Sequence, residues 1–126
     1  MARRVVATDR APAAIGPYSQ GIVTGNLVFT AGQGGVIPGT KTVVEGVEAQ
    51  TRQVMENIKG ILETAGTSMD RVVKTTVYLA DMADFAKMNA VYATFFPPDP
   101  PARTTIQAAG PPLGLLVEIE AIAEIG

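Results

Sequence analysis

Two charged residues of opposite sign, Arg103 and Glu118, stand in an almost uncharged stretch near the C-terminus, PARTTIQAAGPPLGLLVEIEAIA. An arginine guanidinium is always cationic and matches a carboxylate with two parallel hydrogen bonds. A glutamate on a nearby strand can hold or deprotonate a water molecule. The pair therefore predicts water chemistry on a small organic acid. The simpler interpretation makes Arg103 a loop cap and Glu118 a solvated strand residue.

The chain contains no histidine and no cysteine. Histidine is the usual general base and the commonest metal ligand, while cysteine supplies thiolate nucleophiles, disulfides and zinc ligands. Most familiar hydrolase machinery is therefore excluded, and we expect a site without a metal or a cofactor. The lack of cysteine fits a reducing compartment, and the N-terminal residues lack the apolar core of a signal peptide, so we expect a cytoplasmic protein.

The charge, length and composition of the chain restrict the classes of partner, the number of domains and the oligomeric state that we expect. A net charge of −2 and ten scattered Lys and Arg residues leave no electrostatic footprint for nucleic acid, and no apolar run reaches membrane length. With 126 residues, the chain is expected to form one domain, residues 1–126. Charged residues make up only 17% of it and apolar residues 47%, so we expect a homo-oligomer that covers surplus apolar surface.

The pattern of apolar residues predicts a β-sheet of four to six strands. Strand-forming residues flank the Gly25-Asn26 pair, which favours a tight hairpin turn. A run of β-branched residues at 71–79 indicates a strand of the core. The expected strands are 18–23, 27–30, a short edge strand at 42–44, 71–79, 104–108 and 115–125.

Two helices are expected on one side of this sheet. Apolar residues of the segment 47–65 fall on one helical face, and Gly66 follows where a helix C-terminal glycine belongs. A second helix begins after Asp81, which can cap it, and ends before Pro97-Pro98. Its apolar stripe, more often core than ligand site, consists of Phe85, Met88, Val91, Tyr92 and Phe95.

Alternation along the last strand separates its two faces. Leu115, Val117 and Ile119 point to one face, and Glu118 and Glu120 point to the other, away from the helices. That second face is partly apolar, so its natural cover is another subunit. We therefore predict a site between subunits, with Arg103 and Glu118 near the sheet edge.

Three further residues are candidates for binding a small polar ligand. Tyr18 follows a Gly-Pro turn in GPYSQG, where its hydroxyl can reach a ligand, although a packed aromatic is the simpler interpretation. Gly32 in AGQGG allows close backbone approach, although a bulge or turn is the commoner reason for glycine. Asn89 lies between core positions of the second helix, and solvent exposure is its simpler explanation.

Several separated motifs in order resemble the RidA family, also called the YjgF/YER057c/UK114 family. They are IGPYSQG, the pair Gly32-Gln33, VVKTTVYLADMADFAKMNAVYATFF, PART and VEIEAIA, and they span nearly the whole chain. The resemblance implies a chorismate-mutase-like α+β fold with a single mixed sheet and two helices on one face. It also implies a homotrimer with sites between subunits, and deamination of 2-iminobutanoate and 2-iminopropanoate to 2-oxo acids and ammonia.

By the same resemblance, Arg103 binds the substrate carboxylate and Glu118 positions the water, while Tyr18, Gly32 and Asn89 line the pocket. The chain also departs from the family pattern. Thr105 stands where many relatives have cysteine and Ala31 where many have serine, which argues against cysteine-based redox or chaperone-like behaviour. The stretch 109–112, AGPP, replaces a more usual Ala-Leu-Pro and is expected to reshape the pocket rim.

The imine chemistry needs no histidine, metal or nucleophile, because imines already hydrolyse in water and positioning is the main requirement. Three alternatives stay open. One is a carboxylate-binding or protein-interacting trimer without turnover, since a fold does not dictate a function. Another is a deaminase of a different enamine or aminomuconate-type acid. A ribonuclease role is hard to reconcile with an acidic chain that lacks histidine.

Overall fold

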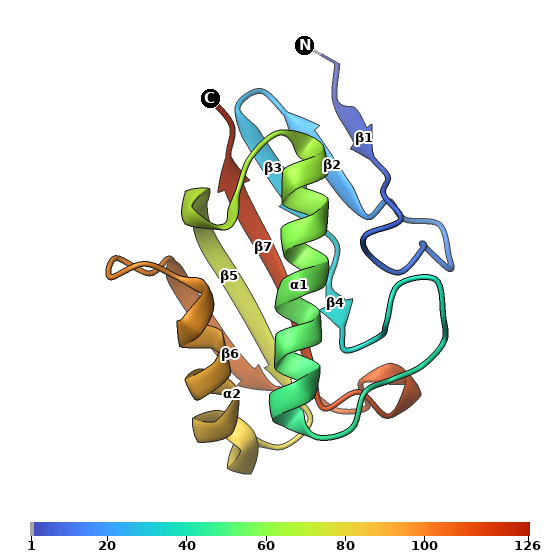
Figure 1. Cartoon of the computed structure of the whole chain (residues 1–126), viewed down its shortest axis with the longest axis vertical. Coiled ribbons are helices and arrows are strands. Elements are labelled where there is room, and N and C mark those ends of the chain that lie inside the picture. Colours follow the sequence, from blue (N-terminus) through green and yellow to red (C-terminus); the bar gives the residue numbers. More distant parts are fainter. Residues whose placement is uncertain (1) are drawn as a thin grey trace.

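Seven strands and two helices succeed one another in the computed structural model, which describes residues 2–126 (Figure 1). The strands are β1 (Arg4–Val6), β2 (Gly21–Thr24), β3 (Leu27–Thr30), β4 (Gln33–Gly34), β5 (Val72–Leu79), β6 (Ala102–Gln107) and β7 (Val117–Glu124). The helices are α1 (Val47–Ala65) and α2 (Phe85–Tyr92). Short 3₁₀ turns occupy Met69–Arg71, Met82–Asp84, Ala93–Phe95 and Pro112–Gly114.

All seven strands belong to one mixed sheet in the order β1-β2-β3-β7-β5-β6, with the short β4 also paired to β7. Only β5 and β6 run parallel, because the chain crosses between them through α2. Both helices cover the same face of the sheet, as Figure 1 shows. The predicted α+β class is therefore confirmed. The sheet has more strands than the predicted four to six because the short β1 and β4 carry too little pattern to be detected.

Helix α1 lies across the middle of the sheet and supplies most of the helical side of the core (Figure 1). Its own residues Val54, Ile58 and Ile61 are fully buried in that core. The helix ends at Gly66, whose φ of 102° lies in the left-handed region and whose N–H reaches the carbonyls of Leu62 and Glu63. The predicted bounds 47–65 and the glycine stop are both confirmed.

Strand β7 alternates as predicted. Val117 and Ile119 are buried toward the helices, while Glu118 and Glu120 are half-buried on the opposite face. That open face continues over neighbouring strands. Its exposed apolar residues include Val5, Phe29 and Ile106. A partly apolar sheet face without a helix over it is one that another copy can cover.

Two predicted elements need correction. The edge strand at 42–44 is wrong, because this segment makes only an isolated bridge between Val36 and Val43. The second α-helix stops at Tyr92 and continues as the 3₁₀ turn Ala93–Phe95. The Asp81 carboxylate does act as a cap, but it accepts from the Ala83 N–H at 2.9 Å in the 3₁₀ turn that precedes α2.

Candidate functional site

Arg103 is held on the helical face of β6. It pairs with Thr75 across the parallel β5–β6 ladder, and residues that pair across strands share a face. Its Nη1 donates a 2.7 Å hydrogen bond to Asn89 Oδ1 on α2. Its guanidinium carbon lies 4.8 Å from the Tyr92 ring centre and 5.5 Å from that of Phe85. The aromatic contacts and the amide together orient the guanidinium plane.

The charge of Arg103 has no acidic partner within residues 2–126. The ion pair found there joins Arg10 to Glu63 instead. A guanidinium has five N–H donors, so the bond to Asn89 leaves most of them for a ligand. A half-buried cation in this state attracts a small anion, and its fork geometry suits a carboxylate.

A hollow of about 630 Å³ adjoins Arg103 and Asn89. Its remaining lining comes from the end of α2 and from the proline-rich segment that leads into β6. Tyr92 and Phe96 form an aromatic pair in this wall, with ring centres 4.8 Å apart. The structure thus places two of the predicted site residues, Arg103 and Asn89, together at one pocket.

Glu118 lies on the other face of the sheet. It is paired with Gly34 on one side and with Tyr78 on the other. A side chain at position 32 would collide with the Glu118 carboxylate, so Gly32 leaves the space that this carboxylate occupies. Burial, and secondarily the nearby Glu120 carboxylate, raises the pKa of Glu118 above its ordinary value. A carboxylate with a raised pKa is a better general base for water.

Tyr18 is about half exposed on the loop that precedes β2. Its hydroxyl oxygen accepts from the Ile15 N–H at 3.3 Å, which leaves the phenolic proton available to a ligand. The buried amide of Gln20 organises this loop, because it donates to the carbonyls of Ala11 and Pro12. The main-chain carbonyl of Gln20 in turn accepts a hydrogen bond from the N–H of Ala31, the residue before Gly32. Tyr18 therefore belongs to a loop that is tied to the Gly32 side.

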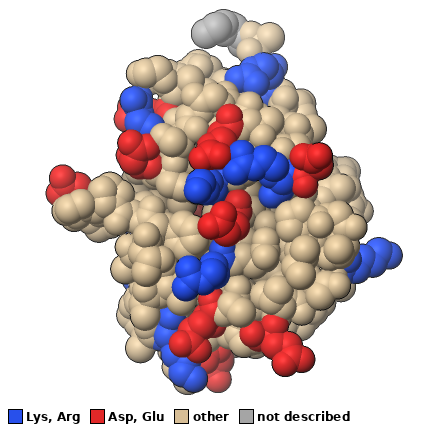
Figure 2. Space-filling model, viewed as in Figure 1, with Lys and Arg blue, Asp and Glu red and all other residues tan. Residues whose placement is uncertain are grey.

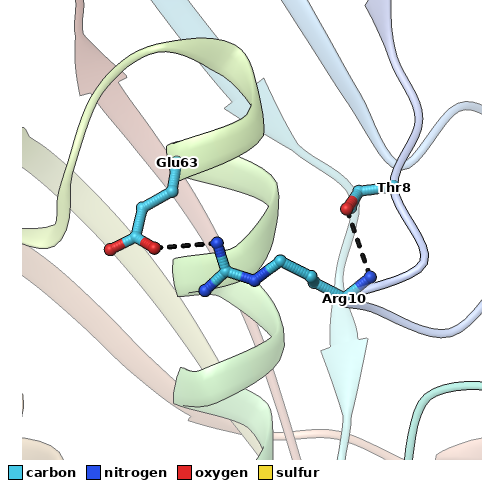
Figure 3. A network of polar contacts seen from close by, with 3 residues as sticks. All are labelled: Thr8, Arg10 and Glu63. Atoms are coloured by element: carbon cyan, nitrogen blue, oxygen red, sulfur yellow. Dashed lines mark hydrogen bonds and ion pairs between the residues drawn. The ribbon is translucent and has the colours of Figure 1, made fainter.

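The same loop is fastened to α1 at its beginning (Figure 3). The Arg10 N–H donates to Thr8 Oγ1 at 3.1 Å, and Arg10 Nη1 lies 2.8 Å from Glu63 Oε1. The two ion-pair side chains are 48% and 38% exposed, so solvent screens the pair and its contribution to stability is small, about 0–1 kcal/mol. The pair is thus a weak contact between the start of the loop and α1.

Within one chain, Arg103 and Glu118 do not meet. Thr75 and Arg103 share the helical face, whereas Tyr78 and Glu118 share the open face. Successive side chains of a strand point to opposite faces, so the sheet itself separates the guanidinium from the carboxylate. Four of the five predicted residues thus form two groups on opposite sides, Arg103 with Asn89 and Glu118 with Gly32. Tyr18 lies on a loop whose end, at Gln20, is hydrogen-bonded to Ala31 beside Gly32.

Two features of the site were not anticipated. The aromatic stripe of α2 was interpreted as core, yet Tyr92 and Phe85 also form the platform under Arg103. Tyr78 pairs with Glu118 across the ladder, and burial, followed by the carboxylates of Glu120 and Glu118, raises the pKa of its hydroxyl above the ordinary value. The register of β5 with both neighbours is needed to find either contact, and sequence spacing alone does not contain it.

The hydroxyl of Thr105 is buried and has no hydrogen-bond partner within residues 2–126. An unsatisfied buried hydroxyl costs about 1–3 kcal/mol. Thr105→Val keeps the shape of the side chain and removes this group, so it is expected to raise the free energy of unfolding by about 1 kcal/mol. Urea denaturation at fixed protein concentration measures the change, with Thr105→Ser as the control that keeps the hydroxyl. A lower midpoint for the valine variant would mean that the hydroxyl has a partner in the assembled protein.

The comparisons with known proteins agree over almost the whole chain. The sequence profile described as Endoribonuclease L-PSP matches residues 8–125. The chain belongs to this family, the RidA/YjgF family. It is 53% identical over 122 residues to a RutC family protein of Pyrococcus horikoshii, covering 96% of this chain and 97% of that one. It is 48% identical over 123 residues to the 2-iminobutanoate/2-iminopropanoate deaminase of Salmonella typhimurium, covering 95% and 96%.

Solved structures of RidA-family proteins share the fold. RidA from an Antarctic Psychrobacter bacterium superposes with a TM-score of 0.94 at 47% identity, covering 97% of this chain and 99% of that one. Escherichia coli TdcF with bound serine superposes with a TM-score of 0.93 at 41% identity, covering 98% of this chain and 99% of that one. These relatives establish the mixed sheet with two helices as the family architecture.

Two further features of this RidA-family chain concern metals and membranes. Residues 2–126 contain no group of three or more Asp, Glu, His or Cys that can hold a metal ion. In the same part of the chain, every helix is too short or too polar to cross a membrane.

Proposed function

We propose that this protein hydrolyses reactive 2-imino acids, such as 2-iminobutanoate and 2-iminopropanoate, to 2-oxo acids and ammonia, in the cytoplasm and without a cofactor. The observation that carries the proposal is Arg103, an oriented guanidinium at a pocket with no acidic partner within residues 2–126. It suits the carboxylate of a small acid. The curated relatives named as deaminases add support, including the Salmonella protein and a chloroplastic Reactive Intermediate Deaminase A of Arabidopsis thaliana at 52% identity.

In the proposed reaction, Arg103 fixes the substrate carboxylate and Glu118 holds a water against the imine carbon. The water oxygen bonds to that carbon, and Glu118 accepts the proton that the water loses. This addition opens the C=N bond, and the same proton passes to the nitrogen to give a carbinolamine. The carbinolamine hydroxyl then gives its own proton to the nitrogen, the C–N bond breaks, and ammonia leaves as the carbonyl forms. Because burial raises the pKa of Glu118, proton acceptance as well as orientation contributes.

We further propose that each site is built from two copies of the chain, Arg103 and Asn89 from one and Glu118, Gly32 and Tyr18 from the next. The two groups lie on opposite faces of the sheet, so joining them requires two different surfaces to meet. Such an interface closes into a ring rather than a two-fold dimer, and a homotrimer is the smallest ring. The exposed apolar residues around Glu118's face favour its coverage by a neighbour.

The test of the activity is the decay of an imine made in place. An amino acid oxidase generates 2-iminobutanoate, semicarbazide traps what remains, and the rate of loss is measured with and without the protein. Faster loss with the protein supports the proposal. No acceleration, while a 2-oxo acid still binds, would replace the enzyme by the alternative of a carboxylate-binding trimer.

The shared site predicts that two inactive variants rescue each other. Arg103→Ala and Glu118→Gln each damage one half of every site. If the two are unfolded together and refolded as a mixture, random assembly pairs an intact Arg103 with an intact Glu118 in about a quarter of the sites. Imine decay should therefore recover to about a quarter of the wild-type rate. The same mixture assembled without exchange is the control, and absence of rescue after proven exchange would place both residues in one chain's site.

The ribonuclease alternative gains no support from the surface. On the face drawn in Figure 2, basic and acidic side chains alternate in a band rather than gathering by sign. The helix beneath the band carries both signs, with Glu48, Arg52, Glu56 and Lys59. A phosphate backbone needs a continuous basic surface.

A further inference from the structure

The hollow beside Arg103 is larger than the proposed substrates require. Its volume of about 630 Å³ falls within the range of roughly 300–1,000 Å³ that is typical of pockets for drug-sized ligands. 2-Iminopropanoate and 2-iminobutanoate have three and four carbons, and after the carboxylate and imine are placed only a methyl or ethyl group remains. The hollow of one chain therefore extends well beyond the atoms of these substrates.

The lining of the hollow is polar at the Arg103 end and apolar elsewhere. Arg103 is its one charged side chain and Asn89 its one amide, and these two already contact each other. The other residues are aromatic, aliphatic or proline: Tyr92, Ala93, Phe96, Pro97, Pro98, Pro100 and Pro101. A ligand that fits this lining carries one carboxylate at the Arg103 end and an uncharged apolar group beyond it.

The apolar wall is also stiff. Proline has a fixed φ and loses almost no side-chain entropy when a ligand packs on it. Phe96 is half-buried and packs against Tyr92 with the two rings tilted by 51°. The Tyr92 hydroxyl in turn lies 2.7 Å from Thr75 Oγ1. A wall that is ordered before the ligand arrives discriminates between ligands without first having to close around them.

We propose that this wall binds the side chain of the 2-imino acid and makes the protein selective for branched aliphatic and aromatic 2-imino acids over the three- and four-carbon ones. This inference rests on the proposed function, and it adds the specificity-determining surface of the same site. Each added methylene in a hydrophobic pocket is worth about tenfold or more in kcat/KM when it is fully enclosed. The hollow is partly open, so a gain of about tenfold is expected for the whole leucine-derived side chain over methyl.

The first experiment compares kcat/KM for the leucine-derived and the alanine-derived imine in the semicarbazide assay, using the assembled wild-type protein. A leucine-to-alanine ratio of about ten supports the inference. A ratio near one or below overturns it and leaves the deaminase function standing.

A second measurement does not depend on turnover. Titration calorimetry compares binding of the unreactive 2-oxo acids 4-methyl-2-oxopentanoate and pyruvate. If neither imine is consumed, the proposed function fails. The ratio of these two dissociation constants then tests by itself whether the apolar wall binds the ligand side chain. Tighter binding of 4-methyl-2-oxopentanoate supports the wall, and equal or weaker binding overturns it.

Matched variants locate the selectivity. Ala93 is exposed and lines the hollow, whereas Ala90 is exposed on the same helical segment and does not line it. Ala93→Leu should narrow the hollow along its apolar wall and lower the leucine-to-alanine ratio about tenfold, while Ala90→Leu should leave the ratio unchanged. An unchanged ratio in Ala93→Leu, or an equal drop in both variants, would show that the side chain binds elsewhere.

Discussion

Replacing Arg103 with alanine is expected to lower kcat/KM for imine hydrolysis by roughly 30-fold or more, with the fold retained. The variant loses the charge-assisted fork to the substrate carboxylate, and removing one partner of such a desolvated pair costs about 2–5 kcal/mol. The aromatic platform loses its cation at the same time, which should cost about 1 kcal/mol of stability. Steady-state kinetics and urea denaturation measure the two effects.

Two companion variants make the Arg103 result specific. Arg52→Ala is the same substitution at an exposed position of α1 and should leave kinetics unchanged. Arg103→Lys keeps the charge but loses the fork, so its activity should lie between wild type and Arg103→Ala. Wild-type activity in a folded Arg103→Ala protein would remove the arginine from the mechanism.

Glu118→Gln is expected to lower kcat by about 10²–10⁴-fold, the usual size of general acid–base catalysis, with little change in KM. The amide keeps the shape but cannot accept the proton from water. Substrate binding, which we propose to depend on Arg103, should survive. A variant with full kcat would leave Glu118 with a structural role only.

The raised pKa of Glu118 gives this prediction a pH signature. The ionised carboxylate is the active form, so wild-type kcat should fall as pH decreases through the pKa of Glu118, above its ordinary value of 4.5. Removing the neighbouring charge in Glu120→Gln should move that fall to lower pH, because Glu120 is the second cause of the shift. The Glu118→Gln profile should be flat there. Glu124→Gln, an exposed position on the same strand, is the control.

Stability should change in the opposite sense to activity. A carboxyl whose pKa is raised by folding favours the folded state below its unfolded pKa, and this contribution is lost as pH rises through the folded value. At neutral pH the half-buried ionised Glu118 therefore weakens the fold, and Glu118→Gln should be the more stable protein. The difference should vanish in acid, where Glu118 is protonated in both states.

The fold could be predicted for those elements whose local residue pattern matches the contacts that they make in the folded protein. Helix α1 has an apolar face that its sequence already displays and a glycine that must end it, so its bounds were predicted correctly. The segment 42–44 has strand-forming residues but finds no ladder beyond one bridge, because strand propensity depends on an available partner. β4 has two residues and exists only through its pairing with β7.

The residues of the candidate site could be predicted from the sequence, but their arrangement in space could not. Arg103 and Glu118 could be chosen as charged residues in an apolar stretch, and the face of Glu118 followed from alternation along β7. The face of Arg103 depends on β6 running parallel to β5, and thus on a register that no local pattern carries. The separation of the two residues by the sheet is for this reason a structural finding.

The prolines that line the Arg103 pocket have a second consequence, which concerns aggregation through the edge of the sheet. β6 ends the strand order, so its outer edge has no partner strand within residues 2–126. An unpaired edge invites a strand from another molecule to add to the sheet. Pro97, Pro98, Pro100 and Pro101 offer no backbone N–H, so the segment before β6 cannot lengthen that edge. A redesign that replaces these prolines to reshape the pocket would therefore also allow the unpaired edge to become longer.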